Sequence, residues 1–263
     1  MTRYKLIIAY DGAEFHGWQK QHQPDPADPE APPRILRTVQ QTVEDAVIRT
    51  VRQPVILIGA SRTDARVHAL GQVAAFTAET SVPVERLHLA INSRLPDDVE
   101  VRGAAIVPDT FDPISDAVKK TYRYTFHTSP DRPLMDRHRV FHCFIPIDES
   151  AMNDAAARLV GEHDFVSFAS VHHGRTSTVR TIYDCSVFRL SAERLVIEVT
   201  GNGFLYNMVR IIAGTLFEVG RGHWPPGKID EILQAKDRRA AGRTMPPQGL
   251  CLMHIDYGGK DQL

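Results

Sequence analysis

The sequence lacks the long apolar runs of membrane proteins and the cysteine patterns of disulfide frameworks and zinc sites. No stretch approaches the roughly 18 consecutive apolar residues that span a membrane. Residues 1–5 lack the apolar segment of a signal peptide. The three cysteines are odd in number and widely spaced, at Cys143, Cys185 and Cys251. We therefore expect a cytoplasmic protein without a membrane partner and without disulfides.

The sequence also lacks a net charge of either sign. With 31 basic and 32 acidic residues the net charge is −1, so the chain as a whole does not indicate a nucleic-acid partner. A local basic cleft is still compatible with this total. Arginines do gather in short clusters, for example at Arg238, Arg239 and Arg243, and each cluster is equally compatible with a solvated surface.

Length and hydrophobic patterning predict an α+β protein. With 263 residues, 43% of them hydrophobic, the chain can form one large domain or two ordinary ones. Strands are predicted at residues 4–10, 55–59, 72–76, 99–107, 120–127, 178–189 and 195–201. Helices are predicted at residues 39–50, 84–95, 148–160 and 204–219. Because two similar series follow each other, we expect two similar lobes.

The lobes should comprise residues 1–112 and 113–263, divided near Phe111-Asp112-Pro113. Within the first lobe, the segment 22–34 contains five prolines and several acidic residues. Proline cannot occupy the interior of a helix or of a central strand. We therefore interpret this segment as an insertion that forms an exposed surface loop.

One polar loop concentrates side chains that can perform chemistry. It follows the apolar run 55–59 and places Arg62, Asp64, Arg66 and His68 within seven residues. Loops held by a rigid scaffold commonly display catalytic side chains. An aspartate after a strand also serves simply as a turn or cap residue. The residues alone therefore define a candidate site and no more.

This loop resembles a known motif, and it is not an isolated match. Arg62-Thr63-Asp64-Ala65 with Val67-His68-Ala69 resembles the motif around the nucleophilic aspartate of the TruA family, the tRNA pseudouridine(38–40) synthases. Five further blocks resemble other motifs of the family in the same order: Tyr10-Asp11-Gly12 with Phe15-His16-Gly17-Trp18-Gln19, Lys120-Thr121-Tyr122-Arg123-Tyr124, Gly161-x-His163-Asp164-Phe165-x-Ser167-Phe168, Gly203-Phe204-Leu205 with Met208-Val209-Arg210, and Pro246-Pro247-Gln248-Gly249-Leu250. Together they cover nearly the whole chain.

The resemblance implies a pseudouridine synthase fold, in which two α/β lobes share a mostly antiparallel sheet with a central cleft. It implies Asp64 as the nucleophile, Tyr122 as the aromatic residue against the target base, and Arg210 as the ionic partner of Asp64. Arg62 would hold the target nucleotide outside the RNA helix, and Leu250 would line the pocket. The resemblance further implies a homodimer that acts on uridines 38–40 of the tRNA anticodon stem-loop.

The implied reaction adds no atoms to the RNA. The N–C1′ bond breaks, the uracil turns and C5 is joined to C1′, so we expect neither a metal nor an organic cofactor. A carboxylate nucleophile must be ionised; burial raises its pKa, and a guanidinium within about 4–6 Å favours the charged form. Attack at C1′ and attack at C6 are both compatible with such a nucleophile. The target base must also leave its helix, and stacking on an aromatic ring offsets part of that free-energy cost.

The same residues have structural explanations. Tyr122 and Tyr124 fit a strand whose aromatic side chains pack in the core. Arg210 fits a snorkelling arginine in an apolar helix, although burial without an anion would be unfavourable. The histidines and Cys143 of residues 138–143 could ligate zinc, but no second ligand pair accompanies them, and we expect no metal.

Two residues of the catalytic loop depart from the family, which usually has glycine at both places. Ser61 and Arg66 stand there. Glycine tolerates a positive φ or a close backbone approach, and another residue in such a conformation costs on the order of 1 kcal/mol or more. We therefore expect a locally reshaped loop. We also hypothesise that Arg66 points into the RNA cleft and contacts a phosphate.

Two other functions are compatible with the sequence. The altered loop could belong to an RNA-binding protein that has lost catalysis, although Asp64, Tyr122 and Arg210 are all retained. Asp64 could instead serve a hydrolase, but no convincing second carboxylate or metal set accompanies it in the sequence.

Overall fold

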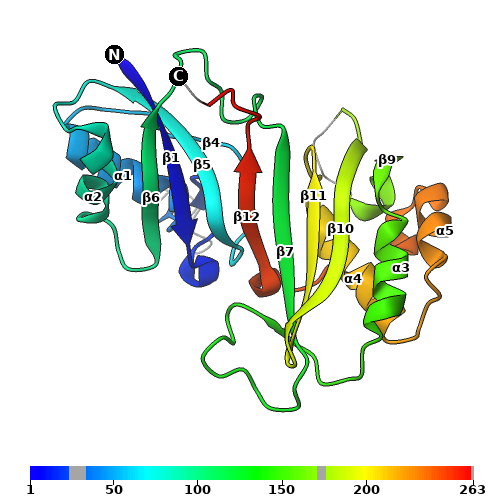
Figure 1. Cartoon of the computed structure of the whole chain (residues 1–263). Helices are drawn as coiled ribbons and strands as arrows, with labels where there is room; N and C mark the ends of the chain where they lie inside the picture. The colour runs from blue at the N-terminus through cyan, green and yellow to red at the C-terminus, as the bar shows by residue number, and fades with distance from the viewer. Residues whose placement is uncertain (24–33, 171–175, 262–263) are drawn as a thin grey trace. The chain divides into compact units, whose positions relative to one another are not determined.

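The computed structural model describes residues 1–23, 34–170 and 176–261 and divides the chain into two compact units (Figure 1). The first unit comprises Met1–Val118 together with Leu252–Leu263, and the second comprises Lys119–Cys251. The end of the chain thus belongs to the first unit. Most of the expected insertion at 22–34 lies outside the described residues.

Where its residues are described, the first unit contains an antiparallel sheet with two α-helices. In this sheet β1 (Thr2–Tyr10) lies between β6 (Val99–Ile106) and β5 (His68–Ala78), and β5 also pairs with the short β4 (Ile58–Gly59). Helices α1 (Val39–Val51) and α2 (Val84–Asn92) lie side by side against this sheet (Figure 1). Strand β12 (Leu250–Asp256) follows β5 in the strand order.

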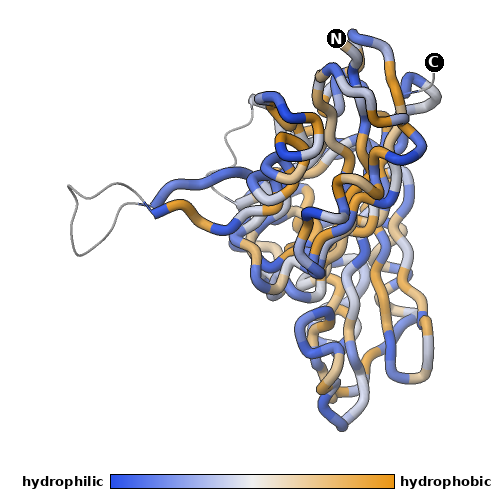
Figure 2. The backbone as a smooth tube through the Cα atoms, turned by 90° about the vertical axis from the view of Figure 1, so that its left-hand side faces the viewer, coloured by the Kyte–Doolittle hydropathy of each residue, from blue (hydrophilic) through white to orange (hydrophobic). Residues whose placement is uncertain are grey.

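Alternation of side chains explains which face of β1 is buried. Leu6 and Ile8 are fully buried, whereas Ile7 between them is 38% exposed. Helix α1 contributes the fully buried Val43 and Val47 to the same core. The alternation of hydrophobic and hydrophilic residues can be followed along the chain in Figure 2. Period-two burial of this kind is typical of a sheet with one covered face.

In the residues that the structure describes, the second unit contains another mostly antiparallel set of strands and three α-helices (Figure 1). Its strand order is β7 (Lys119–His127), β11 (Arg194–Gly201), β10 (Val179–Ser191) and β9 (Gly161–Asp164), and β8 (Phe141–His142) pairs with β7 in parallel. The helices are α3 (Glu149–Ala157), α4 (Met208–Gly220) and α5 (Lys228–Ala235). The short elements of the described chain are β2 (His22–Gln23), β3 (Arg34–Ile35), η1 (Gly12–Glu14), η2 (Val166–Phe168), η3 (Arg238–Ala240) and η4 (Pro247–Gly249).

The predicted α+β class with a mostly antiparallel sheet is confirmed. The predicted helices at 39–50, 84–95 and 148–160 are present, as are all predicted strands except most of 55–59. Helix α5 and strands β2, β3, β8, β9 and β12 were not predicted. Among the residues that the structure describes, no helix combines the length and hydropathy of a membrane span.

The prediction of a strand over residues 55–59 is wrong for most of that run. Only Ile58 and Gly59 pair with β5, and Ile56 is 77% exposed. The hydrogen-bonding groups of Leu57 are taken by α1: its N–H donates to Glu44 Oε2 at 2.8 Å and its carbonyl accepts from Gln40 Nε2 at 2.8 Å. Helix side chains here replace a neighbouring strand.

The helix predicted from residue 204 begins later, at Met208. Asn207 precedes it with φ 62°, in the left-handed region, so the backbone cannot enter the helix earlier. Leu205 is buried without being helical. This apolar residue before Met208 therefore belongs to the core but not to the helix.

Candidate active site

Asp64 lies in the loop between β4 and β5 of the first unit. Asp64 is partly exposed, and Arg62 and Arg66 on either side are exposed. Thr63 is buried, and its Oγ1 is 2.7 Å from the hydroxyl of Tyr10 at the end of β1. The loop thus presents one carboxylate between two arginines while its preceding residue is fixed in the core.

The segment after β1 holds the backbone on both sides of Asp64. The N–H of Trp18 donates to the carbonyl of Thr63 at 3.0 Å, and the N–H of Arg66 donates to the carbonyl of Phe15 at 3.2 Å. Gly17, at φ 91°, lies so close that a Cβ there would be 2.8 Å from the carbonyl oxygen of Thr63. A side chain at position 17 would therefore displace the loop.

A buried amide from β5 fixes the start of the same loop. Gln72 is fully buried; its Oε1 accepts from the N–H of Ser61 at 3.2 Å, and its Nε2 donates to the carbonyl of Ser61 at 2.6 Å. The side chain thus pairs with the Ser61 backbone as a neighbouring strand would. At the other end, the N–H of Val67 donates to the carbonyl of Asp64 at 3.2 Å and closes a turn. These contacts fix the backbone on both sides of Asp64.

Arg66 has the backbone conformation that usually belongs to glycine. Its φ is 67°, whereas Ser61 does not have a positive φ. The left-handed conformation costs a non-glycine residue roughly 1–2 kcal/mol. The expected backbone strain is therefore present at Arg66 and not at Ser61. The proposed phosphate contact of Arg66 stays a prediction.

Tyr122 lies on β7 of the second unit with little of its surface exposed. It is 7% exposed, and its ring makes an edge contact with Phe204 at a centroid distance of 5.2 Å. Tyr124, two residues along the strand, is fully buried and donates its hydroxyl to the carbonyl of Pro246 at 2.8 Å. Burial raises the pKa of Tyr124 above its usual value, opposed by the positive charges of Arg210 and Arg243. Tyr124 therefore serves as a neutral hydrogen-bond donor.

Arg210 occupies the first turn of α4 and is only partly exposed. Its Nε donates to the carbonyl of Met245 at 2.7 Å, and its Nη1 donates to Asn207 Oδ1 at 2.7 Å. The N–H of Met245 in turn donates to the carbonyl of Arg210 at 3.2 Å. These directed contacts fix the guanidinium, which a freely snorkelling arginine would not show.

Leu250 begins β12 and is 7% exposed. The preceding Gly249 packs on the ring of Tyr124 so closely that a Cβ would lie 2.5 Å from the ring. The segment 245–250 therefore joins Arg210, Tyr124 and Leu250 within the second unit. Arg62, Asp64 and Arg66 lie together in the first unit.

The sequence pattern did not identify the residues that hold the loop. Gln72 was assigned to a strand without a role, although a polar residue between Gly71 and the apolar run 73–76 is a signal for a buried hydrogen bond. Tyr10 and Gly17 belong to a block that resembles a family motif, and the resemblance alone implies no contact with the loop. In the described part of the chain, no group of three or more His, Cys, Asp or Glu side chains could hold a metal ion.

Comparison with known proteins gives matches over nearly the whole chain. Residues 6–114 and 155–258 match a family model described as tRNA pseudouridine synthase. The tRNA pseudouridine synthase A of Acetivibrio thermocellus is 42% identical over 258 residues, which cover 98% of this chain and 100% of the relative. The protein of that name from an Exiguobacterium species is 41% identical over 257 residues, 98% of each chain. That from Geotalea uraniireducens is 41% identical over 257 residues, 98% of this chain and 100% of the relative.

Proposed function

Because this chain belongs to the tRNA pseudouridine synthase family, we propose that it isomerises uridine to pseudouridine in tRNA with the carboxylate of Asp64 as nucleophile. The observation that carries the proposal is the Asp64 loop itself. Asp64 is partly exposed, while the backbone N–H groups of Trp18 and Arg66 and the side-chain amide of Gln72 hold the surrounding chain. A fixed nucleophile avoids the entropic cost of being positioned at each turnover.

The chemistry requires one nucleophile and a balanced transfer of protons. Asp64 forms a covalent bond to the nucleotide, at C1′ or at C6, and the N1–C1′ bond breaks. The uracil turns, C5 bonds to C1′, and the bond to Asp64 breaks so that the carboxylate is restored. A proton then leaves C5 and N1 gains one, so the base keeps its composition. The Tyr122 ring lies against the base. Its hydroxyl is a group that can both accept and donate a proton, and it relays the C5 proton.

Arg210 is assigned the role of keeping the Asp64 carboxylate ionised, and Leu250 that of an apolar wall of the pocket. Support for both comes from the family motifs; the fixed guanidinium in the first turn of α4 supports the role of Arg210, and the burial of Leu250 supports that of Leu250. A nearby guanidinium lowers the pKa of a carboxylate. Replacing Arg210 with glutamine should therefore move the acid limb of the kcat profile to higher pH, with a smaller move for Arg210→Lys.

The substrate sites that we propose are uridines 38–40 of the anticodon stem-loop, in a cytoplasmic homodimer. Arg62 holds the target nucleotide outside the helix, and Arg66 contacts a phosphate. The exposure of both arginines on either side of Asp64 supports these roles. Backbone phosphates position RNA without reading its sequence, which suits an enzyme that acts on neighbouring positions.

The decisive experiment compares wild type with Asp64→Ala and Asp64→Asn on an unmodified tRNA transcript, with pseudouridine mapped on the product. Both variants should form none while still binding tRNA. The matched control is Asp45→Asn, since Asp45 is an exposed carboxylate on α1 of the same unit. Tritium release from C5-labelled uridine measures catalysis separately. A wild-type protein that binds tRNA but releases no tritium would be an RNA-binding protein without catalysis.

A further inference from the structure

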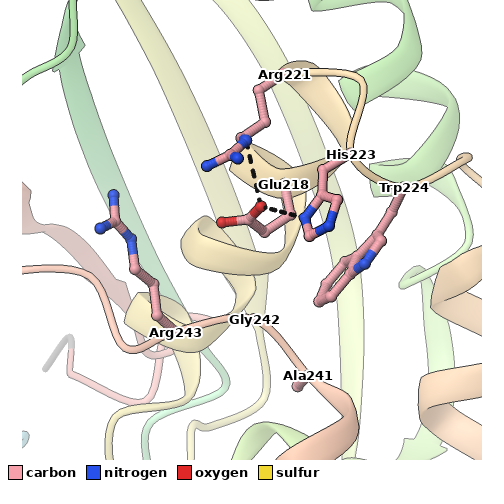
Figure 3. A pocket seen from close by; sticks show the side chains of 7 residues that line it. All are labelled: Glu218, Arg221, His223, Trp224, Ala241, Gly242 and Arg243. Atoms are coloured by element: carbon pink, nitrogen blue, oxygen red, sulfur yellow. Dashed lines mark hydrogen bonds and ion pairs between the residues drawn. The ribbon is translucent and has the colours of Figure 1, made fainter.

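An open pocket of about 320 Å³ lies in the second unit where α4 ends (Figure 3). No residue used in the proposed mechanism lines it. Its lining residues are Glu218, Arg221, His223, Trp224, Ala241, Gly242 and Arg243. The pocket therefore needs an explanation of its own.

Arg243 is an exposed cation whose position is set before any ligand arrives. Its guanidinium carbon lies 5.4 Å from the ring centroid of Phe141 and 5.3 Å from that of Phe217. Its carbonyl packs so closely on Gly214 that α4 has no room for a Cβ there. Within the described chain, Arg243 forms no ion pair with a carboxylate. A guanidinium that is ordered but lacks an anion loses little conformational freedom on binding a phosphate.

The other charges of the pocket leave it net positive. Its single carboxylate, Glu218, is shared between two groups: Arg221 Nε at 3.5 Å and His223 Nδ1 at 2.9 Å from Oε2 (Figure 3). Glu218 is only 14% exposed, whereas the Arg221 and His223 side chains are 43% and 57% exposed. Two guanidinium groups thus face solvent around one engaged carboxylate. They also offset the partial negative charge of the α4 C-terminus.

An aromatic surface adjoins these cations. The rings of His223 and Trp224 stack at a centroid distance of 5.7 Å with 20° between their planes, and Trp224 is partly exposed. Guanidinium groups beside an aromatic face are the combination that binds nucleotides of an RNA strand, because phosphate and base are held at once.

We propose that this pocket is an RNA-binding site separate from the catalytic loop, in which Arg243 and Arg221 bind a backbone phosphate and Trp224 lies against the adjoining base. The identity of the RNA as tRNA rests on the proposed function. The site gives the enzyme a second point of attachment to its substrate. Its contribution is to binding and not to the isomerisation step.

Trp224 supplies a direct probe of occupancy. The chain has two tryptophans, and the other, Trp18, is 2% exposed. Titration with unmodified tRNA transcript should quench the emission assigned to Trp224 by difference from Trp224→Phe. In Arg243→Gln the quenching should weaken, and the slope of log K against log salt should fall by about 0.7–0.9 for each phosphate that is no longer neutralised. Arg158→Gln is the matched control, since Arg158 is an exposed arginine of the same unit paired with Asp230.

Each outcome supports or overturns the proposal. Emission from Trp224 that tRNA does not change, or an unchanged salt slope in Arg243→Gln, overturns it. Equal quenching by inorganic phosphate or uridine monophosphate would make the pocket a small-anion site and also overturn it. A changed oligomeric state in Arg243→Gln would assign the pocket to an interface between copies of the chain, with the same consequence. Arg243→Lys retains the charge and should recover most of the slope, which separates weaker binding from a failure to fold.

The test also distinguishes this proposal from the proposed function. If wild-type protein forms pseudouridine but tRNA does not quench Trp224, the proposed RNA-binding role of the pocket is overturned and the proposed activity stands. If tRNA quenches Trp224 but no pseudouridine forms, the RNA-binding role of the pocket stands and the proposed activity is overturned. In the expected case, Arg243→Gln raises KM for full-length tRNA and leaves kcat unchanged.

Discussion

Replacing Gln72 with methionine should loosen the catalytic loop while keeping a side chain of similar length. The buried amide makes two hydrogen bonds to the backbone of Ser61, at 3.2 and 2.6 Å. Each contributes about 0.5–1.5 kcal/mol net, so their loss should lower the free energy of unfolding by about 1–3 kcal/mol. Urea unfolding measures this directly. A loop displaced by an ångström would also lower kcat on the order of 100-fold.

Gln72→Glu separates loop positioning from general stability. An introduced carboxylate can accept from the N–H of Ser61, but it can donate to the carbonyl only when protonated. Burial raises the pKa of such a carboxyl group. The ratio of variant to wild-type kcat should therefore rise as pH is lowered through that pKa, whereas Gln72→Met should show a flat ratio. Gln234→Glu on the exposed side of α5 is the control.

The reasoning about Gln72 is refuted by either of two results. One is a methionine variant with wild-type unfolding and wild-type kcat. The other is a glutamate variant whose kcat ratio does not change with pH. Both readouts are needed, because a purely structural role would change stability without producing the pH dependence.

Three further predictions concern single residues. Arg66→Gly should relieve the left-handed backbone and raise the unfolding free energy by roughly 0.5–1 kcal/mol after allowing for the flexibility of glycine, seen as a higher Tm; an unchanged or lower Tm would contradict this. Gly59→Ala would overlap the indole of Trp18 and should destabilise by about 1–3 kcal/mol, so a wild-type urea midpoint would argue against it. The hydrogen bond from Thr178 lowers the pKa of Asp164, so its stabilisation is present above its unfolded pKa of about 3.9 and is lost as pH falls through the folded value. The stability gap between wild type and Asp164→Asn should close over that acid range, and a constant gap would show that the carboxylate is not responsible.

Local patterns predicted the elements whose own residues show a clear period or a cap. The long strands and helices α1 to α3 follow from alternation, helical spacing and caps such as Asp148, whose Oδ1 accepts from the N–H of Ala151. The strand prediction for residues 55–59 was wrong because the backbone of Leu57 forms its hydrogen bonds with the side chains of Gln40 and Glu44 on a helix. No window around residue 57 contains that information.

In the candidate site, too, the sequence predicted some features and not others. Motif resemblance selected Asp64, Tyr122 and Arg210 by residue type and order. It did not reveal what holds them, because the amide of Gln72 and the carbonyl of Met245 act across 11 and 35 residues of sequence. Tertiary hydrogen bonds of this kind depend on backbone positions that a linear pattern does not specify.

The return of Leu252–Leu263 to the first unit has a consequence for synthesis on the ribosome. Nearly all of the second unit, Lys119–Cys251, has been synthesised before the strand that follows β5 is completed at Asp256. Until then the growing chain exposes an unpaired strand edge, which invites pairing with other nascent chains. A fragment truncated at residue 118 should share this liability, and closing the unit through so distant a segment should slow its maturation.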